Sequence, residues 1–277
     1  MTTFHRFAAV DWSGANTPKR GADSIWIAAT GRKSTNPPTR TEATGQLGAL
    51  ISDALAADER LLIGFDFAFG FPAGFAAAVG LRGWEGGWAH LHDHIEDGAG
   101  NRSNRFQVAA AWNRLCAGAG PFWGYTMKRG LPDGLARTRH GKWEHPFDYT
   151  RHAEKAERRA SPVLELAYTG SVGSQSLLGM ARLEALRRRF PGQIAVWPFE
   201  TDFAGDLSAP VVFAEIYPSR HAVPDGAGVK DKRQVEAVLR DFAAWNGDAL
   251  LRALAAPSLK GKARTEVRAE EGWVVGL

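Results

Sequence analysis

Cysteine is nearly absent from this chain of 277 residues, which contains one, Cys116. A single cysteine excludes an intrachain disulfide framework, and the first residues lack the apolar stretch of a secretory signal peptide. Long apolar runs are missing as well, since no window approaches the roughly 20 apolar residues that a transmembrane helix requires. These absences predict a cytoplasmic protein without a membrane span.

Clusters of one charge are also scarce. The formal net charge is +4 and the isoelectric point is about 9.3, but the basic residues are spread along the chain. The densest run, Arg187–Arg189, ends an amphipathic helix pattern, where cations are common. A nucleic-acid footprint normally requires clustered Lys and Arg. The charge pattern therefore permits an anionic ligand without requiring one.

The residues that are present include 44% hydrophobic side chains, which is enough for a sizeable core. Their patterns predict an α/β fold with a single domain over residues 1–277 and a partly helical insertion at about 81–160. Strands are expected at 4–13, 24–31, 39–44, 60–72, 194–199 and 211–218. Helices are expected at 45–59, 105–116, 174–190 and 230–245, and 270–277 is expected to be a short strand or tail.

Two aspartates end apolar runs that read as strands, Asp11 in AAVDWSGA and Asp66 in LLIGFDFAFGFP. If these strands are parallel neighbours, the two carboxylates meet at one edge of the sheet and repel each other unless they are protonated or bridged by cations. Hard oxygen ligands suit Mg²⁺ or Mn²⁺. Glu215, in a later strand, and Asp231, in a later helix, are further candidates for the same catalytic or metal site.

Each acid also has a purely structural interpretation. Asp11 and Ser13 can cap a turn through hydrogen bonds to nearby backbone. Glu215 can form a salt bridge with Arg220, and Asp231 can cap the helix at whose start it lies. Two more acids, Glu270 and Glu271, would reach the sheet edge only through a returning C-terminal tail.

Other polar clusters are less specific. Three histidines at 90, 92 and 94 allow a zinc site, although exposed histidines of an insertion are the simpler reading. The glycine-rich segment GSVGS at 170–174 precedes a helix, so free backbone amides there, with Ser174, can bind phosphate. Cys116 reads as a buried helix residue.

Five segments, VDWSGA, GFDFAFGFP, GSVGSQSLLG, AEIYPSR and EEGWVVG, resemble domain-of-unknown-function family 429 over almost the whole chain. More broadly, the order of strands and acids resembles the ribonuclease H-like fold. The resemblance implies a mixed five-stranded sheet flanked by helices, with three antiparallel strands first. It also implies magnesium at Asp11 and Asp66, with a late acid for which Asp231 is the nearest match.

These observations lead to two hypotheses. The first is a metal-dependent, nuclease-like phosphoester hydrolase acting on a nucleic acid or nucleotide-like substrate, held by Ser13, Lys19, Arg20, Ser174 or Arg220. The second is a non-catalytic protein that binds a small anionic ligand or a partner protein, with the tryptophan-rich insertion as a pocket wall. Labels among the family's members tie the second hypothesis to cofactor biosynthesis.

Overall fold

The structure is a computed structural model that describes residues 4–139, 141–223, 226–245 and 247–277. The strands are β1 (Arg6–Asp11), β2 (Trp26–Ala29), β3 (Leu61–Asp66), β4 (Ile194–Val196) and β5 (Val211–Glu215). The helices are α1 (Arg40–Ala56), α2 (Phe75–Ala78), α3 (Gly83–His94), α4 (Arg105–Leu115), α5 (His152–Ala156), α6 (Gly173–Arg189), α7 (Lys230–Ala244), α8 (Gly247–Ala255) and α9 (Gly261–Glu266). Short helical turns η1 (Pro218–Arg220) and η2 (Val267–Glu271) complete the order.

One mixed sheet of five strands forms the centre, in the order β2-β1-β3-β5-β4. Only β2 runs antiparallel to its neighbour, because β1, β3, β5 and β4 pair in parallel. The carboxyl ends of four strands therefore meet at one edge. The fully apolar sequence of β3 before Asp66 fits its place between two parallel neighbours, buried on both faces.

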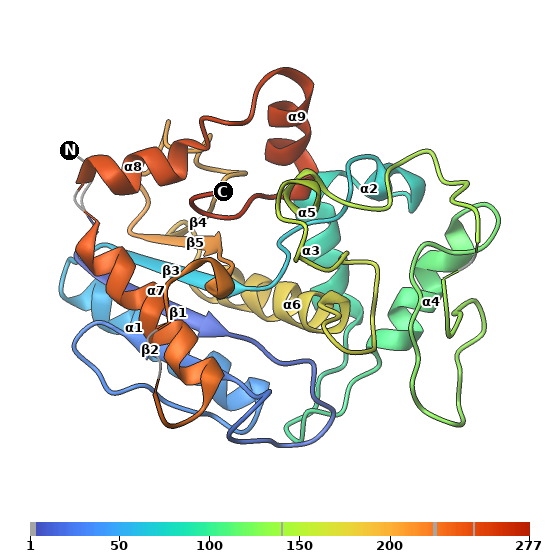
Figure 1. Cartoon of the computed structure of the whole chain (residues 1–277), viewed down its shortest axis with the longest axis horizontal. Coiled ribbons are helices and arrows are strands. Elements are labelled where there is room, and N and C mark those ends of the chain that lie inside the picture. Colours follow the sequence, from blue (N-terminus) through green and yellow to red (C-terminus); the bar gives the residue numbers. More distant parts are fainter. Residues whose placement is uncertain (1–3, 140, 224–225, 246) are drawn as a thin grey trace.

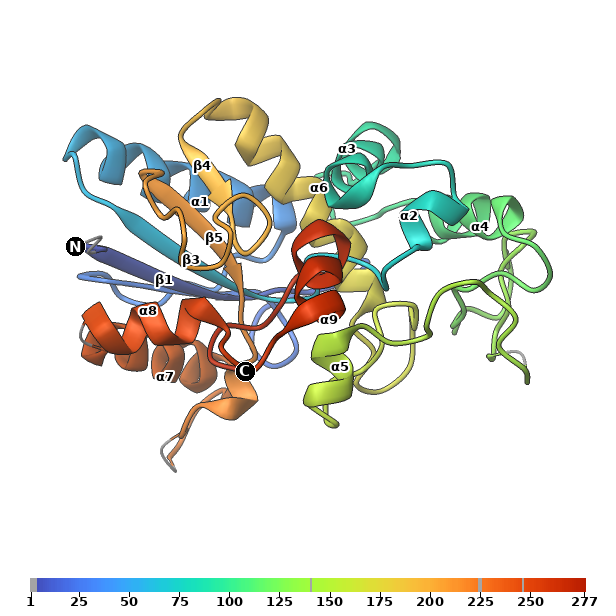
Figure 2. The same cartoon turned by 90° about the horizontal axis from the view of Figure 1, so that it is seen from above.

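Helices cover both faces of this sheet (Figures 1 and 2). Alternate side chains of β1, such as Val10, pack with α1 and α6 in one hydrophobic cluster. The intervening residues, such as Ala9, pack with α7, α8 and the C-terminal tail in a second cluster. The period-two alternation of the strands thus assigns each residue to the α6 face or to the α7 face.

The segment that contains α2 to α5 lies beyond the carboxyl ends of the parallel strands in both views (Figures 1 and 2). Its tryptophans Trp84, Trp88 and Trp112 are buried and belong to the hydrophobic cluster of the α6 face. The expected partly helical character between 81 and 160 is thus confirmed by α3, α4 and α5. None of the described helices is long and apolar enough to cross a membrane.

The expected strand at 39–44 is wrong. Thr39 is instead the N-cap of α1, and its hydroxyl accepts a hydrogen bond from the Glu42 amide at 3.2 Å. The spacing Thr39-x-x-Glu42 matches a helix-start signal that outweighs the β propensity of the threonines. Three antiparallel strands at the start of the sheet, which the resemblance implied, are therefore not found. Near this position only Thr35 forms an isolated bridge, to Ile27 of β2.

Gly70 lies where the C-terminal tail crosses the segment after β3. A Cβ atom at this position would approach the Glu270 carbonyl oxygen to 1.9 Å. Because that neighbour is backbone, we expect Gly70→Ala to lower the free energy of unfolding by about 1–3 kcal/mol or more. Chemical denaturation of the variant checks this. Gly100→Ala, where nothing lies within 4 Å, is the matched control and should change stability by less than about 0.5 kcal/mol.

Candidate active site

Asp11 and Asp66 occupy the last positions of β1 and β3, and they are register partners across this parallel pair. Register partners in neighbouring strands project to the same side of a sheet, with backbones about 4.8 Å apart. The alternation of the strands places both side chains on the α7 face. The expectation that the two strands are parallel neighbours with coinciding carboxyl ends is confirmed.

The surroundings make the charged form of this pair costly, although each side chain keeps some solvent contact. Burial raises the pKa of Asp11 well above its ordinary value, and the carboxyls of Asp66, then Asp231 and Asp23, add to the shift. Burial also raises the pKa of Asp66 to about 7, followed by the effects of Glu215 and Asp231. The pair therefore favours a bound proton, or a bound cation, over two free negative charges at this edge of the sheet.

Asp231 lies in the first turn of α7, on the same face as the aspartate pair. It does not cap its helix, since the N-cap residue is Val229 and no side-chain cap is formed. Its Oδ2 instead accepts a hydrogen bond from the Asp23 amide at 2.6 Å. This bond ties the loop before β2 to α7 and keeps a third negative charge close to Asp11 and Asp66.

Glu215 ends β5 as expected, but it is in register with Phe65 and so belongs to the opposite face from Asp66. Its carboxylate is held by Arg151, whose Nη1 and Nη2 donate at 2.9 and 2.8 Å. The Phe69 amide adds a third hydrogen bond at 3.0 Å. Both members of this ion pair are at least 95% buried. Glu215 is thus neutralised by a direct ion pair with Arg151, whereas Asp11 has only the more distant charge of Lys230 near it.

The expected pairing of Glu215 with Arg220 is wrong. Arg220 instead contacts Glu157 at 3.2 Å and the Gly276 carbonyl at 3.2 Å. The true partner, Arg151, was not singled out in the sequence, because it lies in a polar stretch, YTRHAEKAERR, whose other charges face solvent in ordinary proteins. The 64 positions between the two partners leave no local spacing signal.

The tail does return to the sheet edge, since Val274 bridges Glu215 and the Val275 amide donates to the Glu215 carbonyl at 3.0 Å. Glu270, however, accepts hydrogen bonds from the Gly74 and Ala76 amides at 2.8 and 2.5 Å. Glu271 likewise accepts from the Ala73 and His152 amides. Both acids thus connect the C-terminal tail to the α2 and α5 regions through hydrogen bonds.

One cavity is lined by Asp66, and a second is lined by the loop that follows Asp11. The first, the Asp66 cleft, holds about 40 Å³ and is lined by Asp66, Arg151, Glu154, Glu215 and Tyr217 among others. The second, the Arg105 cavity, holds about 340 Å³ and is lined by Ser13, Lys19, Arg105, Tyr168, Ser174 and Gln175 among others. The first turn of α6 borders both, since Val172 lines the first and Ser174 the second.

Of the five expected substrate-binding residues, three line the Arg105 cavity and two do not. Ser13, Lys19 and Ser174 line the Arg105 cavity, whereas Arg20 and Arg220 do not. The hydroxyl of Ser174 is already engaged, because it donates to the Leu166 carbonyl at 2.5 Å and accepts from Arg105. Arg20 donates to the Asn36 carbonyl. The Ser13 hydroxyl accepts from the Ala15 amide at 3.2 Å, which confirms its turn-capping alternative, but its own hydrogen and the Lys19 ammonium can still contact a ligand.

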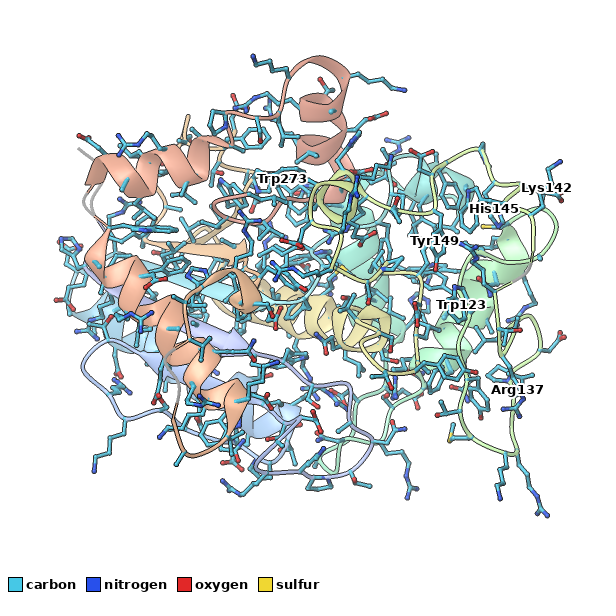
Figure 3. All side chains as sticks on the ribbon, in the orientation of Figure 1. Trp123, Arg137, Lys142, His145, Tyr149 and Trp273 are labelled. Atoms are coloured by element: carbon cyan, nitrogen blue, oxygen red, sulfur yellow. The ribbon has the colours of Figure 1, made fainter. Side chains whose placement is uncertain are left out.

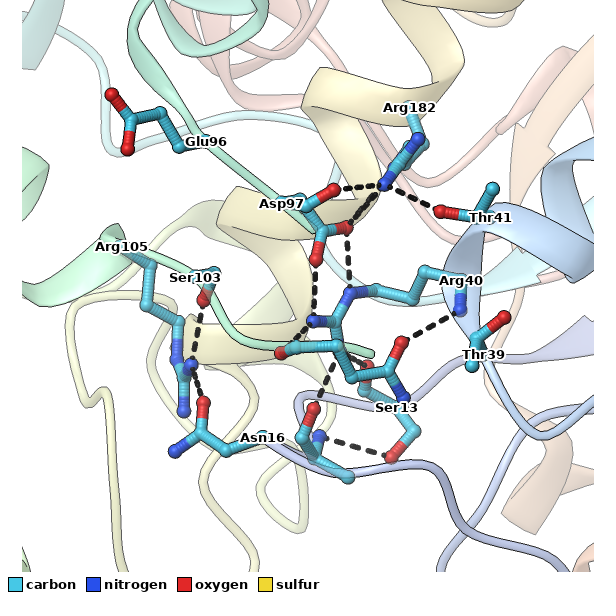
Figure 4. A network of polar contacts seen from close by, with 12 residues as sticks. Ser13, Asn16, Thr39, Arg40, Thr41, Glu96, Asp97, Ser103, Arg105 and Arg182 are labelled. Atoms are coloured by element: carbon cyan, nitrogen blue, oxygen red, sulfur yellow. Dashed lines mark hydrogen bonds and ion pairs between the residues drawn. The ribbon is translucent and has the colours of Figure 1, made fainter. Parts of the chain in front are cut away.

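A buried network of polar groups fixes the loop after Asp11 (Figure 4). Arg40 is fully buried and forms a bidentate ion pair with Asp97, through Nε at 2.8 Å and Nη2 at 2.7 Å. Its Nη1 donates to the carbonyls of Ser13 and Ala15 at 3.0 and 2.8 Å. Arg182 of α6 shares the same Asp97. The loop is therefore anchored between α1 and α6.

The donor chemistry of the aspartate pair fits a hard divalent cation. The described residues give neither carboxylate a hydrogen bond or an ion pair, and the side chain of Gln175 contacts only the backbone oxygen of Asp66, at 2.9 Å. No group of three or more His, Cys, Asp or Glu suited to a metal ion occurs among these residues. Two carboxylates suffice for Mg²⁺, which usually keeps several waters and takes further oxygens from a substrate.

The histidine cluster on α3 does not form such a group. His90 and His94 stack on each other with ring centroids 4.0 Å apart, and His94 Nδ1 lies 2.9 Å from the His90 carbonyl oxygen. His92 Nδ1 lies 3.4 Å from the Ala181 carbonyl oxygen, on a different helix. The arrangement gives the zinc alternative no support within the described part of the chain.

No protein-family model, curated protein or solved structure matches the chain. The resemblance to family 429 and to the ribonuclease H-like fold therefore stays a prediction, and the functional argument rests on the geometry of the aspartate pair.

Proposed function

We propose that this protein is a divalent-metal-dependent phosphoester hydrolase of ribonuclease H-like architecture, with its centre at Asp11 and Asp66. The observation that supports the proposal best is the register pairing of these two residues, which brings together two carboxylates that form no ion pair within the described part of the chain. Cation-dependent phosphoryl chemistry uses such a cluster of hard oxygen ligands. The mixed sheet, with aspartates ending adjacent parallel strands, supports the architectural part.

The residues of this chain have separate tasks in the proposed reaction. Asp11 and Asp66 hold the cation, and Asp231 adds negative charge from α7. Lys19 and Ser13 hold the anionic substrate beside the pair. Bound Mg²⁺ or Mn²⁺ would supply charge neutralisation at the phosphate and a more acidic water. Hydrolysis then adds a water oxygen to phosphorus and breaks one ester P–O bond, with the proton passing to the leaving oxygen.

Isothermal calorimetry with Mg²⁺ and Mn²⁺ tests the proposal together with an activity assay. We expect the parent to bind the cation and to cleave a diester such as bis(4-nitrophenyl) phosphate or a short DNA or RNA strand. Asp11→Asn and Asp66→Asn should lose cation binding and reduce cleavage at least about 100-fold, which is roughly 3 kcal/mol of transition-state stabilisation. The same change at an exposed position, Asp58→Asn, is the matched control and should preserve both.

Two results would contradict this proposal in different ways. A parent that binds neither cation removes the metal site. A parent that binds a cation through Asp11 and Asp66 but leaves every diester intact is a binding protein, as the second hypothesis states. The Arg105 cavity favours an anionic ligand in that case.

A further inference from the structure

The Arg105 cavity contains a buried cation that has no carboxylate partner. Arg105 is 95% buried, and its Nε donates to Ser174 Oγ at 2.8 Å. Its Nη1 donates to Asn16 and Ser103, both neutral acceptors (Figure 4). Its Nη2 has no hydrogen-bond partner among the described residues. Burial, followed by the charge of Arg40, lowers the pKa of Arg105 to about 10, so the guanidinium remains charged near neutral pH.

A buried charge without an ion pair is costly in a folded protein. The guanidinium of Arg105 lies 4.4 Å from the centroid of the Phe106 ring, and the charge of Asp97 acts on it without forming an ion pair. Arg40 shows the contrast, because it is equally buried but bidentately paired with Asp97. Since Arg105 lines an open cavity, a ligand anion can supply the missing partner. Lys19 lines the same cavity with its side chain 43% exposed, and its carboxylate neighbour Asp23 lies on the surface at 3.4 Å.

The first turn of α6 lines the same cavity through Ser174 and Gln175. Their amides are the backbone donors at this turn, because the Gly173 amide already donates to the Glu165 carbonyl at 2.9 Å. Helix α6 begins at Gly173, and its N-cap residue Val172 forms no side-chain cap. Gly14 packs directly against this turn: a Cβ on it would lie 3.1 Å from Ser174 Cβ and 3.2 Å from the Gln175 nitrogen. A helix of 17 residues carries positive potential at this end. Glycine at position 14 thus lets the loop after Asp11 lie close to the Ser174 and Gln175 backbone, and a side chain here would change the shape of the cavity at this turn.

An aromatic side chain completes the wall of the cavity. Tyr168 is 44% exposed, and its ring stacks on Trp123 with centroids 6.1 Å apart. Its hydroxyl donates to the Arg137 carbonyl at 2.8 Å, and both Trp123 and Arg137 lie in the segment beyond the sheet edge (Figure 3). Tyr168 adopts φ of +94°, a backbone region that a tyrosine rarely occupies. The ring is therefore held as a fixed platform.

We infer that the Arg105 cavity is a subsite for a nucleoside monophosphate unit, whose phosphate binds Arg105, Lys19 and the first turn of α6 and whose base stacks on Tyr168. A buried cation with an exposed aromatic platform is the combination that holds phosphate and base together in single-stranded nucleic-acid sites. The volume lies within the usual range for small ligands. The inference rests on the proposed function only in placing this unit next to the reacting phosphate at Asp11 and Asp66.

Calorimetry in EDTA with the Asp66→Asn variant tests this subsite separately from catalysis. Without metal or turnover, we expect adenosine 5′-monophosphate to bind at least about tenfold more tightly than adenosine, because the nucleoside lacks the charge that Arg105 and Lys19 neutralise. A short single-stranded oligonucleotide distinguishes the two sources of this chemistry. Affinity above that of the mononucleotide assigns the subsite to a nucleic-acid chain, and equal affinity assigns it to a free nucleotide.

Four substitutions examine the parts of the subsite. Gly14→Ala should weaken mononucleotide binding at least about fivefold, whereas Gly100→Ala should not. Lys19→Ala should weaken it about three- to tenfold, with the exposed Lys142→Ala as its control. Tyr168→Asn removes the ring but tolerates positive φ, and we expect a loss of about fivefold or more for a stacked base. Asp23→Asn should strengthen binding by freeing Lys19.

The inference is overturned if adenosine binds as well as its monophosphate, or if Gly14→Ala and Tyr168→Asn both bind like the parent. These variants change surface or loop positions, so circular dichroism and thermal melting can establish that each is folded before binding is measured. Because cation binding and cleavage are not measured here, a failure of the subsite leaves the metal proposal standing. Conversely, phosphate-dependent binding in EDTA supports the subsite even if the protein cleaves nothing.

Discussion

Replacing Arg151 with methionine is expected to lower the free energy of unfolding by about 3–5 kcal/mol, the range measured when one partner of a buried ion pair is removed. Arg151 is 97% buried and contacts Glu154 and Glu215, which are themselves at least 95% buried. It also donates to the Glu271 carbonyl at 2.8 Å, which joins α5 to the C-terminal tail. Methionine fills similar space but leaves two carboxylates in a low-dielectric interior. Urea denaturation monitored by tryptophan fluorescence measures the difference.

Two further variants separate loss of charge from loss of packing. The triple change Arg151→Met, Glu154→Gln and Glu215→Gln removes both orphaned charges, so we expect it to recover at least about half of the lost stability. Arg268→Met is the control, since this arginine is 54% exposed and contacts only Asp202, at 3.4 Å. It should cost less than about 1 kcal/mol. A comparably small loss at Arg151 would show that the buried pair does not stabilise the fold.

The contrast between Arg151 and the aspartate pair shows what the sequence could reveal. Asp11 and Asp66 are conspicuous because each is the first charge after an apolar run, and the rule that parallel strands end together then places them side by side. Arg151, however, lies among other charged residues, so nothing in its local sequence distinguishes it. Its role depends on a contact across 64 positions, and no spacing rule in one sequence encodes that distance. Arg105 escaped notice for the same reason.

The same physics explains the error in the sheet. Residues 39–44 contain three threonines, and threonine favours strands through its branched Cβ. In the structure, the Thr39 hydroxyl instead accepts a hydrogen bond from the Glu42 amide. Without this acceptor, the amide would be one of the unpaired donors at the start of the helix. A side-chain hydrogen bond at a helix terminus thus overrides an intrinsic propensity of a few tenths of a kcal/mol.

The aspartate pair itself predicts an unusual dependence of stability on pH in the absence of metal. Burial, with Glu215 and Asp231, raises the pKa of Asp66 to about 7 from an ordinary value of 3.8. Between these values the folded state holds a proton that the unfolded state has released. Stability from this group is therefore fully present below about pH 4 and is lost as pH rises toward and through about 7. Its size is a few kcal/mol, since one pKa unit corresponds to about 1.4 kcal/mol.

Urea denaturation of the parent and of Asp66→Asn in EDTA, from about pH 5 to about pH 8, isolates this contribution from other titrating groups. Because asparagine does not titrate, we expect the variant to gain on the parent as pH rises and to be the more stable protein near pH 8. Asp58→Asn should shift the curve little at any pH. A parent whose stability relative to Asp66→Asn is flat across this range would show that the Asp66 carboxyl is not perturbed.

Added Mg²⁺ should reverse the trend in the parent alone. Near pH 8 Asp66 is ionised and the cation can displace a proton from Asp11, so cation binding stabilises the folded state by mass action. Near pH 5 protons already occupy the pair and compete with the cation, and the stabilisation should largely disappear. The residues that destabilise the metal-free fold at high pH are thus the ones that bind the cation. Stabilisation by Mg²⁺ that is equal at both pH values, or that persists in Asp66→Asn, would place the cation elsewhere.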